Sequence, residues 1–364
     1  MKIFWLFNHP APYKVNLFNL LGKKAEVEAY FERSSEKGRN ALFYSETPIS
    51  FSAHFCKGIS WGEMDNYSRD PIKALKKNRY DVIVLNGWRT LTEQRTIAYC
   101  KRKKLPYVFL INGGIVKEKE LGLLKAIKTH FISGASAYLS PDEKSKQYLV
   151  HYGAEDSRVF YYPYSSIFEK ELQEKPLSKE GKQALRKELG LQGEKVFLSA
   201  GQLIPRKNYA PLIRFWKSRP QGESLYILGD GEQKEELLLL IKELGLTNVF
   251  LLPHKPHEEV LKYFSAGDCF LFPSKEDIYG HVINEALSQG VPVISSPNVN
   301  AALHLIKDGR NGFLDSFEEE GALGEKLSCF PDQRMEEEAL RTARGFTMET
   351  SAEFLYLFFK ERCQ

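Results

Sequence analysis

Two acidic residues, Asp277 and Glu285, lie on either side of a glycine turn in the second half of the sequence. Between them Tyr279 precedes Gly280, and the residues that follow have the apolar spacing of a helix. The unpaired amides at a helix start favour a negative group such as a diphosphate. A carboxylate one turn into the helix suits the two hydroxyls of a ribose, and one in the preceding loop suits a hexose. The pattern therefore indicates a site for a sugar nucleotide.

A pair of cations, Arg206 and Lys207, follows an earlier apolar run that ends near Gly201. Negative charge accumulates on a nucleoside diphosphate as it leaves a sugar, and paired cations stabilise that charge. We therefore expect both side chains to contact the diphosphate. The alternative is that Arg206 and Lys207 only form the solvated start of a helix.

The segment around the acidic pair resembles the signature of the family 4 glycosyltransferases, which have the GT-B fold and retain the anomeric configuration of the donor sugar. That signature has two acidic residues separated by seven others, with an aromatic residue and glycine in between and alanine after the second acid. Asp277, Tyr279, Gly280, Glu285 and Ala286 fit the spacing. The sequence departs from the pattern at Asp277, where the family usually has glutamate.

The resemblance implies a donor site in the second half of the chain, which takes a nucleoside-diphosphate sugar, with a UDP-sugar expected first, and no metal or other cofactor. The implied catalytic group is Asp277 on the transferred sugar with Arg206 and Lys207 on the diphosphate. Gln202 replaces an arginine of the family pattern, and Arg206 is expected to take over its role. The implied donor-binding residues are Glu285, Gly280, Tyr279, His281, Val282, Ile278, Gln202 and His254.

The first half of the chain is more divergent, as acceptor domains of this family are. Its candidate residues lie in loops that follow apolar runs, where specificity is usually encoded. Asn112 stands roughly where relatives place a histidine near the donor sugar. The candidate acceptor residues are His9, Tyr13, Asn86, Asn112 and Gly113.

Short apolar runs alternate with longer amphipathic stretches in both halves, which is typical of parallel sheets connected by helices. Strands are predicted at 3–7, 27–31, 82–85, 107–111 and 137–140, and again at 196–200, 225–228, 249–252, 269–272 and 291–295. The clearest predicted helices are 91–103, 117–131, 231–244, 282–289 and 347–360.

The length of 364 residues suits two domains. We predict an α/β protein of GT-B type, in which two Rossmann-like domains face a central cleft. The amino-terminal acceptor domain is expected to cover 1–165 and to be joined by a C-terminal helix, 346–364, that crosses back to it. The donor domain is expected to cover 166–345.

The small net charge of +4 conceals an uneven distribution. Residues 1–163 hold 26 Lys and Arg against 16 Asp and Glu, whereas 164–364 hold 25 against 31. One basic segment of the first half also carries leucines and an isoleucine, which favours an anionic membrane surface over a plain solvated face. Nucleic acid is not expected as a partner, because stacking aromatics are not interleaved with the basic residues. The segment contains Lys117, Lys119, Lys125 and Lys128 together with Leu121, Leu123, Leu124 and Ile127.

Several protein classes are disfavoured by what the sequence lacks. Its five cysteines form no CxxC pair, which argues against zinc and disulfide frameworks. No apolar run reaches the length of a membrane span, and the first residues resemble a buried strand more than a signal peptide. We therefore expect a cytoplasmic protein, with peripheral attachment to the inner face of the cell membrane as an option.

The predicted function is retaining transfer of a sugar to a hydroxyl of a glycan or lipid-linked acceptor in cell-envelope polysaccharide biosynthesis. Two alternatives stay open, a nucleotide-sugar epimerase or hydrolase of the same fold and a non-catalytic protein that binds sugar nucleotides. A dinucleotide oxidoreductase would carry a Gly-x-Gly-x-x-Gly turn after the first strand, where this chain has Asn8, His9 and Pro10.

Overall fold

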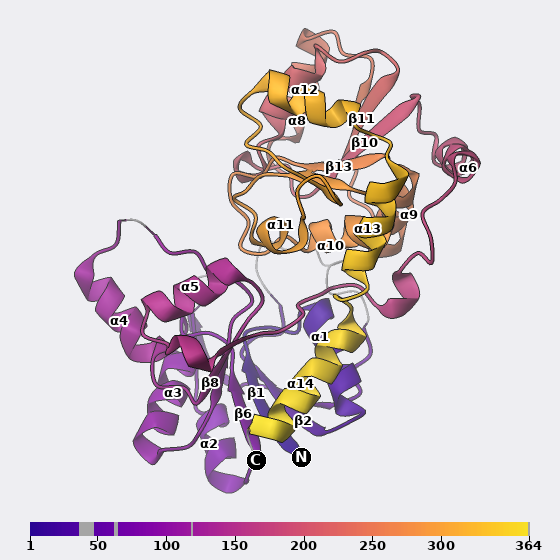
Figure 1. The fold of residues 1–364 in the computed structure, drawn as a ribbon. Helices are drawn as coiled ribbons and strands as arrows, with labels where there is room; N and C mark the ends of the chain where they lie inside the picture. Colours follow the sequence, from indigo (N-terminus) through magenta and orange to yellow (C-terminus); the bar gives the residue numbers. More distant parts are fainter. Residues whose placement is uncertain (36–46, 62–64, 118, 363–364) are drawn as a thin grey trace. The chain divides into compact units, whose positions relative to one another are not determined.

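The computed structural model describes residues 1–35, 47–61, 65–117 and 119–362, so the last two residues of the predicted helix 346–364 lie outside them. The chain divides into two compact units (Figure 1). Unit 1 comprises Met1–Ser165 and Met348–Gln364, and unit 2 comprises Ser166–Thr347. Each contains a parallel sheet with helices, so the predicted α/β class and its two Rossmann-like domains are confirmed.

Among the described residues, the sheet of unit 1 has seven parallel strands in the order β3-β2-β1-β6-β7-β8-β9. Its central strands are continuous apolar runs because both faces are covered. A separate antiparallel hairpin pairs β4 with β5. The strands are β1 (Lys2–Phe7), β2 (Glu26–Phe31), β3 (Ser52–Phe55), β4 (Gly58–Trp61), β5 (Asp65–Ser68), β6 (Val82–Leu85), β7 (Val108–Leu110), β8 (Ala137–Ser140) and β9 (Val159–Tyr161).

The helices of unit 1 include one from the far end of the chain. The helix α14 packs against unit 1, where Phe359 lies 6.1 Å from Trp5 and Phe358 lies 5.1 Å from Phe160 between ring centroids. Lys24 also forms an ion pair with Glu353 at 2.5 Å. The helices are α1 (Pro12–Gly22), α2 (Asp70–Lys77), α3 (Leu91–Lys103), α4 (Gly122–Ile132), α5 (Glu143–His151) and α14 (Met348–Arg362).

Unit 2 is built on six parallel strands in the order β12-β11-β10-β13-β14-β15. The strands are β10 (Lys195–Ala200), β11 (Glu223–Leu228), β12 (Val249–Leu252), β13 (Cys269–Phe272), β14 (Val293–Ser295) and β15 (Gly312–Leu314). The helices are α6 (Lys179–Leu189), α7 (Tyr209–Trp216), α8 (Lys234–Glu243), α9 (His257–Ala266), α10 (His281–Ser288), α11 (Asn300–Leu305), α12 (Glu320–Ser328) and α13 (Gln333–Ala343).

Each sheet has a point where the strand order reverses. In unit 2 the chain moves outward from β10 through β11 to β12, then returns to place β13 on the other side of β10. In unit 1 the same reversal separates β1 from β6. Ligands of open α/β sheets bind beyond the carboxyl ends of the strands at such a point. The loops after β10 and β13 are therefore the first place to look for a site in unit 2.

Buried charged side chains cluster at the opposite, amino end of the unit 2 sheet. Asp268, directly before β13, accepts a hydrogen bond from the Val196 amide at 2.8 Å and pairs with Arg186 at 2.7 Å. Lys182 lies 3.5 Å from Asp268 and 2.6 Å from Glu336 of α13. All four charged side chains are at most 10% exposed. The cluster joins α6 and α13 to the start of the central strands.

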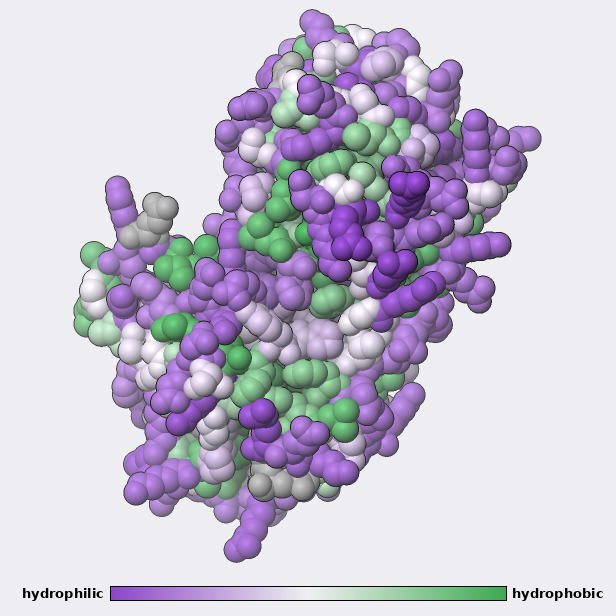
Figure 2. Space-filling model, viewed as in Figure 1, coloured by the Kyte–Doolittle hydropathy of each residue, from purple (hydrophilic) through white to green (hydrophobic). Residues whose placement is uncertain are grey.

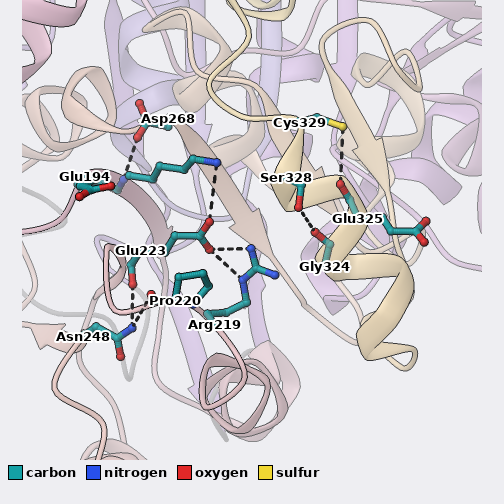
Figure 3. Close-up of polar contacts among 12 residues, drawn as sticks. Glu194, Arg219, Pro220, Glu223, Asn248, Asp268, Gly324, Glu325, Ser328 and Cys329 are labelled. Atoms are coloured by element: carbon teal, nitrogen blue, oxygen red, sulfur yellow. Dashed lines mark hydrogen bonds and ion pairs between the residues drawn. The ribbon is translucent and has the colours of Figure 1, made fainter.

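A second polar group at this end ties the β11 start to its neighbours (Figure 3). Glu223 lies 2.7 Å from Arg219 and 3.8 Å from Lys195, and its carbonyl accepts a hydrogen bond from Asn248 at 2.8 Å. Trp216 also donates to that carbonyl at 3.2 Å. Every charge here is matched by a protein partner, as buried charge requires.

The basic segment of the first half differs from its prediction in two ways. The helix begins at Gly122 rather than at residue 117. Lys128 is 9% exposed and pairs with Glu120, so it cannot offer its charge to a membrane surface. The Lys128 ammonium instead lies over the Tyr152 ring, 4.7 Å from its centroid.

Candidate active site

The Lys207 ammonium lies 2.5 Å from a carboxylate oxygen of Asp277, and Arg206 lies 3.6 Å from the same oxygen. Arg206 and Lys207 belong to a single 3-10 turn, Pro205–Lys207, after β10. Asp277 comes from the loop after β13, the strand next to β10. The structure thus brings together the three residues of the predicted catalytic group at the reversal point of the sheet.

The Lys207 and Arg206 side chains lie in different environments. Lys207 is 7% exposed, and its ammonium stands 4.4 Å from the centroid of the Phe272 ring. Burial lowers the pKa of Lys207, while the neighbouring Asp277 carboxylate opposes that shift. The Arg206 side chain is 41% exposed and donates to the Glu276 carbonyl at 2.6 Å. Positive charge is therefore fixed at one buried point and one solvent-accessible point.

The loop that carries Asp277 is fastened by backbone contacts. The Asp277 amide donates to the Asn298 carbonyl at 3.1 Å, and the Asn300 amide donates to the Asp277 carbonyl at 3.3 Å. The second carboxylate oxygen of Asp277 accepts a hydrogen bond from the Tyr279 amide at 3.3 Å. One carboxylate oxygen thus faces both cations and the other faces the Tyr279 amide, and the carboxylate keeps further acceptor capacity for a ligand hydroxyl.

Gly280 is required by the turn into α10. Its φ of 94° lies in the left-handed region, and a Cβ atom there would stand 2.7 Å from Val299. The helix begins at His281, whose ring packs edge-on against Tyr279 at 4.9 Å. The amides of the first helical turn, which include those of His281 and Val282, have no acceptor within their own helix and suit an anion.

Glu285 lies in the second turn of α10 and is half-buried. One of its carboxylate oxygens accepts a hydrogen bond from the Ser166 hydroxyl at 3.0 Å. Ser166 was not singled out in the sequence, because no motif marks it and the contact joins positions 119 residues apart.

The remaining predicted donor residues differ in exposure. Tyr279 is 4% exposed, so only its backbone faces the loop contacts described above, whereas Ile278 is 53% exposed. Gln202 is exposed after β10, and His254 is exposed after β12. Within the described ranges, no hydrogen bond or ion pair joins Gln202 or His254 to Lys207 or Asp277.

The acceptor candidates of unit 1 lie after the carboxyl ends of its strands. His9 is 4% exposed and follows β1, while Asn86 is half-buried after β6. Asn112 accepts a hydrogen bond from the Tyr162 hydroxyl at 3.3 Å. Gly113, next to Asn112, has a φ of 155°. Tyr13, at the start of α1, packs edge-on against Tyr164 at 5.9 Å.

Lys14 is a buried cation that the sequence analysis did not single out. Its side chain is fully buried, and its ammonium has no hydrogen-bond partner among the described residues. Aromatic rings surround it, with Tyr164 and Phe7 centroids at 5.0 and 5.4 Å. Burial lowers the pKa of Lys14 to about 7. Sequence alone gave no signal, because Tyr164 reaches Lys14 only through the fold.

No cluster of three or more His, Cys, Asp or Glu side chains that could hold a metal occurs in the described part of the chain. The charged group around Asp277 has two cations and one acid, a donor set that suits an anionic ligand better than a cation. None of the helices described in the structure is long and apolar enough to cross a bilayer.

Comparison with known proteins finds a family match that covers most of unit 2. Residues 181–343 match the family described as glycosyl transferases group 1. The matched segment contains the cation turn, the Asp277 loop and α10. The resemblance inferred from the motifs is thus confirmed for group 1 glycosyltransferases, and the narrower placement in family 4 stays a prediction.

Two curated relatives have related roles in their names. A Campylobacter jejuni N-acetylgalactosamine-N,N'-diacetylbacillosaminyl-diphospho-undecaprenol 4-alpha-N-acetylgalactosaminyltransferase is 32% identical over 162 residues, or 44% of this chain and 42% of the relative. The Rhizobium meliloti lipopolysaccharide core biosynthesis glycosyltransferase LpsE is 31% identical over 119 residues, or 33% of this chain and 34% of the relative. The chain thus covers less than half the length of these relatives.

Solved structures extend the similarity in fold to the whole chain. Anabaena HepE in complex with UDP matches with a TM-score of 0.76 at 18% identity, and covers 99% of this chain and 100% of HepE. WaaG, a glycosyltransferase involved in lipopolysaccharide biosynthesis, matches with a TM-score of 0.69 at 17% identity, over 98% and 99% of the two chains. The fold is therefore that of the GT-B glycosyltransferases, as the sequence predicted.

Proposed function

We propose that this protein is a retaining glycosyltransferase that takes a sugar from a nucleoside diphosphate and attaches it to a hydroxyl of a glycan or lipid-linked acceptor. The observation that carries the proposal is the group of Arg206, Lys207 and Asp277 at the carboxyl ends of β10 and β13. The match of residues 181–343 to group 1 glycosyltransferases supports it independently.

Lys207 and Arg206 stabilise the leaving diphosphate in this proposal. Lys207 is 7% exposed, and a charge–charge contact in such a poorly solvated place is stronger than at the surface. The amides at the start of α10 contribute further positive potential on the other side of the Asp277 loop. Together these groups lower the energy of the transition state in which diphosphate charge develops.

The two acids have different roles in the proposal. Asp277 orients Lys207 through one carboxylate oxygen and offers its remaining lone pairs to hydroxyls of the transferred sugar. Glu285, held by Ser166, binds the ribose. Attack by the acceptor on the face that the diphosphate leaves needs no strong protein base, because the departing phosphate can take the acceptor proton.

A UDP-sugar is the first donor to test, because HepE has been solved in complexes with UDP and with UDP-glucose. The C. jejuni relative, whose name contains a diphospho-undecaprenol acceptor, supports a lipid-linked acceptor. Cell-envelope polysaccharide synthesis is the corresponding role, since LpsE and WaaG are both named for lipopolysaccharide biosynthesis. A cytoplasmic location is part of the proposal.

Release of UDP from a panel of UDP-sugars, measured with and without acceptor glycans, tests this proposal. We expect slow release without acceptor and faster release with one. Glu285→Ala should abolish turnover without lowering the melting temperature, whereas Glu235→Ala, a change at an exposed glutamate of α8, should leave turnover unchanged. Full activity in Glu285→Ala would refute the assigned donor site, and isomerised sugar without transfer would favour an epimerase.

A further inference from the structure

Four large apolar side chains are exposed within seven residues at the start of α4. Leu121 is 80% exposed, Leu123 is 77%, Leu124 is 42% and Ile127 is 38%. Elsewhere in the described chain, large exposed apolar residues are single or, as with Leu238 and Leu239, adjacent pairs. A cluster of exposed apolar side chains on a protein surface marks an interaction site.

Only the last part of α4 is packed into unit 1. Lys128 and Ile132 are the buried residues of the helix, whereas every residue from Gly122 to Ile127 is exposed. Leu123 and Ile127 are four positions apart and therefore lie on the same face of the helix. Figure 2, drawn in the view of Figure 1, shows apolar surface at the outer end of α4. The first turns thus present an apolar face without a protein partner among the described residues.

The inner end of the helix is fixed by an internal charge network. Lys128 pairs with Glu120, and Tyr152 donates a hydrogen bond to the same carboxylate at 2.7 Å. Glu120 is 7% exposed in its side chain, so its negative charge is neutralised inside the fold. This network anchors both sides of the apolar turns and holds them outward.

Exposed lysines precede the apolar turns of α4 and lie within them. Lys117, Lys119 and Lys125 are exposed in the same segment, in which Glu118 lies outside the described residues. A second basic group comes from α3, where Lys101 donates a hydrogen bond to the His130 carbonyl of α4. This contact places the last turn of α3, with Arg102 and Lys103 exposed, next to the end of α4.

We propose that the outer turns of α4 are an interfacial anchor that docks unit 1 on an anionic phospholipid bilayer. Leucine and isoleucine side chains enter the boundary between headgroups and acyl chains, and the flanking lysines and Arg102 contact lipid phosphates. A second copy of the chain fits the same face poorly, because a two-fold interface would set Lys117, Lys119 and Lys125 against their own equivalents. The proposal concerns unit 1 alone and stands whether or not the protein transfers sugar.

Flotation of the full chain with vesicles tests the proposal. Vesicles of phosphatidylcholine with phosphatidylglycerol should carry the protein upward, and vesicles of phosphatidylcholine alone should carry much less. Leu123→Ser with Ile127→Ser should weaken binding to anionic vesicles by about tenfold or more, because two apolar side chains no longer enter the lipid. The matched control is Leu238→Ser with Leu239→Ser on α8, which should bind like the wild type.

The basic groups and the depth of insertion need separate measurements. Arg102→Glu with Lys103→Glu should weaken binding to anionic vesicles by about tenfold and make it less sensitive to salt. Leu123→Trp should show a blue shift of its fluorescence when anionic vesicles are added. Circular dichroism of each variant checks the fold, and UDP release checks unit 2.

Equal flotation of the Leu123→Ser, Ile127→Ser variant and the wild type would overturn the proposal, as would absence of binding to both vesicle types. A wild-type dimer in sedimentation that these two substitutions dissociate, with no lipid binding, would assign the face to self-association instead. If the Leu123→Ser, Ile127→Ser variant loses vesicle binding but releases UDP normally, the anchor is supported and is shown to be independent of the proposed function.

Discussion

The two ends of the unit 2 sheet both hold buried charge, but they hold it differently. At the amino end Lys182, Arg186, Asp268 and Glu336 form a closed network in which no charged side chain exceeds 10% exposure. At the carboxyl end one acid, Asp277, serves two cations, and Arg206 is 41% exposed. The network of Lys182, Arg186, Asp268 and Glu336 has two cations and two acids, whereas the Asp277 group has one more cation than acid.

This difference in charge balance distinguishes charged residues that we expect to stabilise the fold from those that we expect to bind a ligand. A balanced buried network is costly to open, because removal of one partner leaves the other charge unpaired in a poorly solvated place. An unbalanced group is stabilised further when an anion arrives. Substitutions at the amino end should therefore change stability, and substitutions at the carboxyl end should change binding and turnover.

The largest effect is expected at the amino end. Arg186→Met should lower the free energy of unfolding by about 3–5 kcal/mol, because Asp268 loses its 2.7 Å partner. Turnover by the folded fraction should stay near that of the wild type. Urea denaturation with parallel UDP release measures both quantities. An unchanged free energy of unfolding in Arg186→Met would contradict the comparison, because it would mean that the charges at the amino end do not stabilise the fold.

The next largest effect is expected at Lys207. Lys207→Ala should lower kcat/KM by about 100- to 1,000-fold, the usual cost of removing one preorganised group that stabilises transition-state charge. Its melting temperature should not fall as that of Arg186→Met does. Lys242→Ala, at an exposed lysine of α8, is the matched control. A variant at Lys207 that loses stability but keeps turnover would place Lys207 with the structural charges.

The sequence predicted the central elements of the fold because buried parallel strands leave continuous apolar runs. The predicted bounds 82–85, 137–140 and 269–272 coincide with β6, β8 and β13, and 249–252 coincides with β12, an edge strand that still carries an apolar run. It did not predict β3, β4, β5, β9 or β15, which are at most four residues long and lie at sheet edges or in a hairpin. Short edge strands lack the apolar run that marks a strand buried on both faces.

The candidate site was predictable where it depends on topology and unpredictable where it depends on side-chain packing. Residues after adjacent parallel strands meet at one edge of the sheet, so Lys207 and Asp277 could be placed together from their motifs. The contact of Ser166 with Glu285 and the aromatic surroundings of Lys14 could not, because they join distant positions that carry no motif.

A smaller effect is expected in the pH dependence of turnover. Burial lowers the pKa of Lys207 below its ordinary value of 10.5, and Asp277 limits that decrease. Lys207 must carry its proton to stabilise diphosphate, so kcat/KM should fall on the alkaline side at a pH below the ordinary lysine range. Asp277→Asn removes the opposing charge and should move this decline to still lower pH. A pH profile of kcat/KM for both proteins measures the shift, and identical alkaline limbs would separate Lys207 from catalysis.

The smallest effect is expected at Lys14, a buried lysine of unit 1 that has no carboxylate partner among the described residues. Lys14→Met should raise the melting temperature by about 2–4 °C at pH 7, the change that about 1 kcal/mol produces in a protein of this size. The cation–π contacts offset part of the burial cost, which keeps the gain modest.

The gain should depend on pH in a defined direction. The pKa of Lys14 is lowered from 10.5 to about 7, so the unfolded chain binds more protons than the folded one between these values. Wild-type stability therefore gains from deprotonation of Lys14 as pH rises from 7 toward 10.5, and the advantage of Lys14→Met shrinks over that range. Melting curves at several pH values measure it. A destabilised Lys14→Met protein would show that Lys14 has a bound anion or another partner in solution.

Calorimetric titration of UDP into the wild type, Lys207→Ala and Arg186→Met tests most directly whether the carboxyl end of the unit 2 sheet is the donor site. We predict that the wild type and folded Arg186→Met bind UDP with similar affinity, and that Lys207→Ala binds at least about tenfold more weakly because a buried charge contact to phosphate is lost. Equal affinity in Lys207→Ala and the wild type, or a loss of affinity confined to Arg186→Met, would contradict the account.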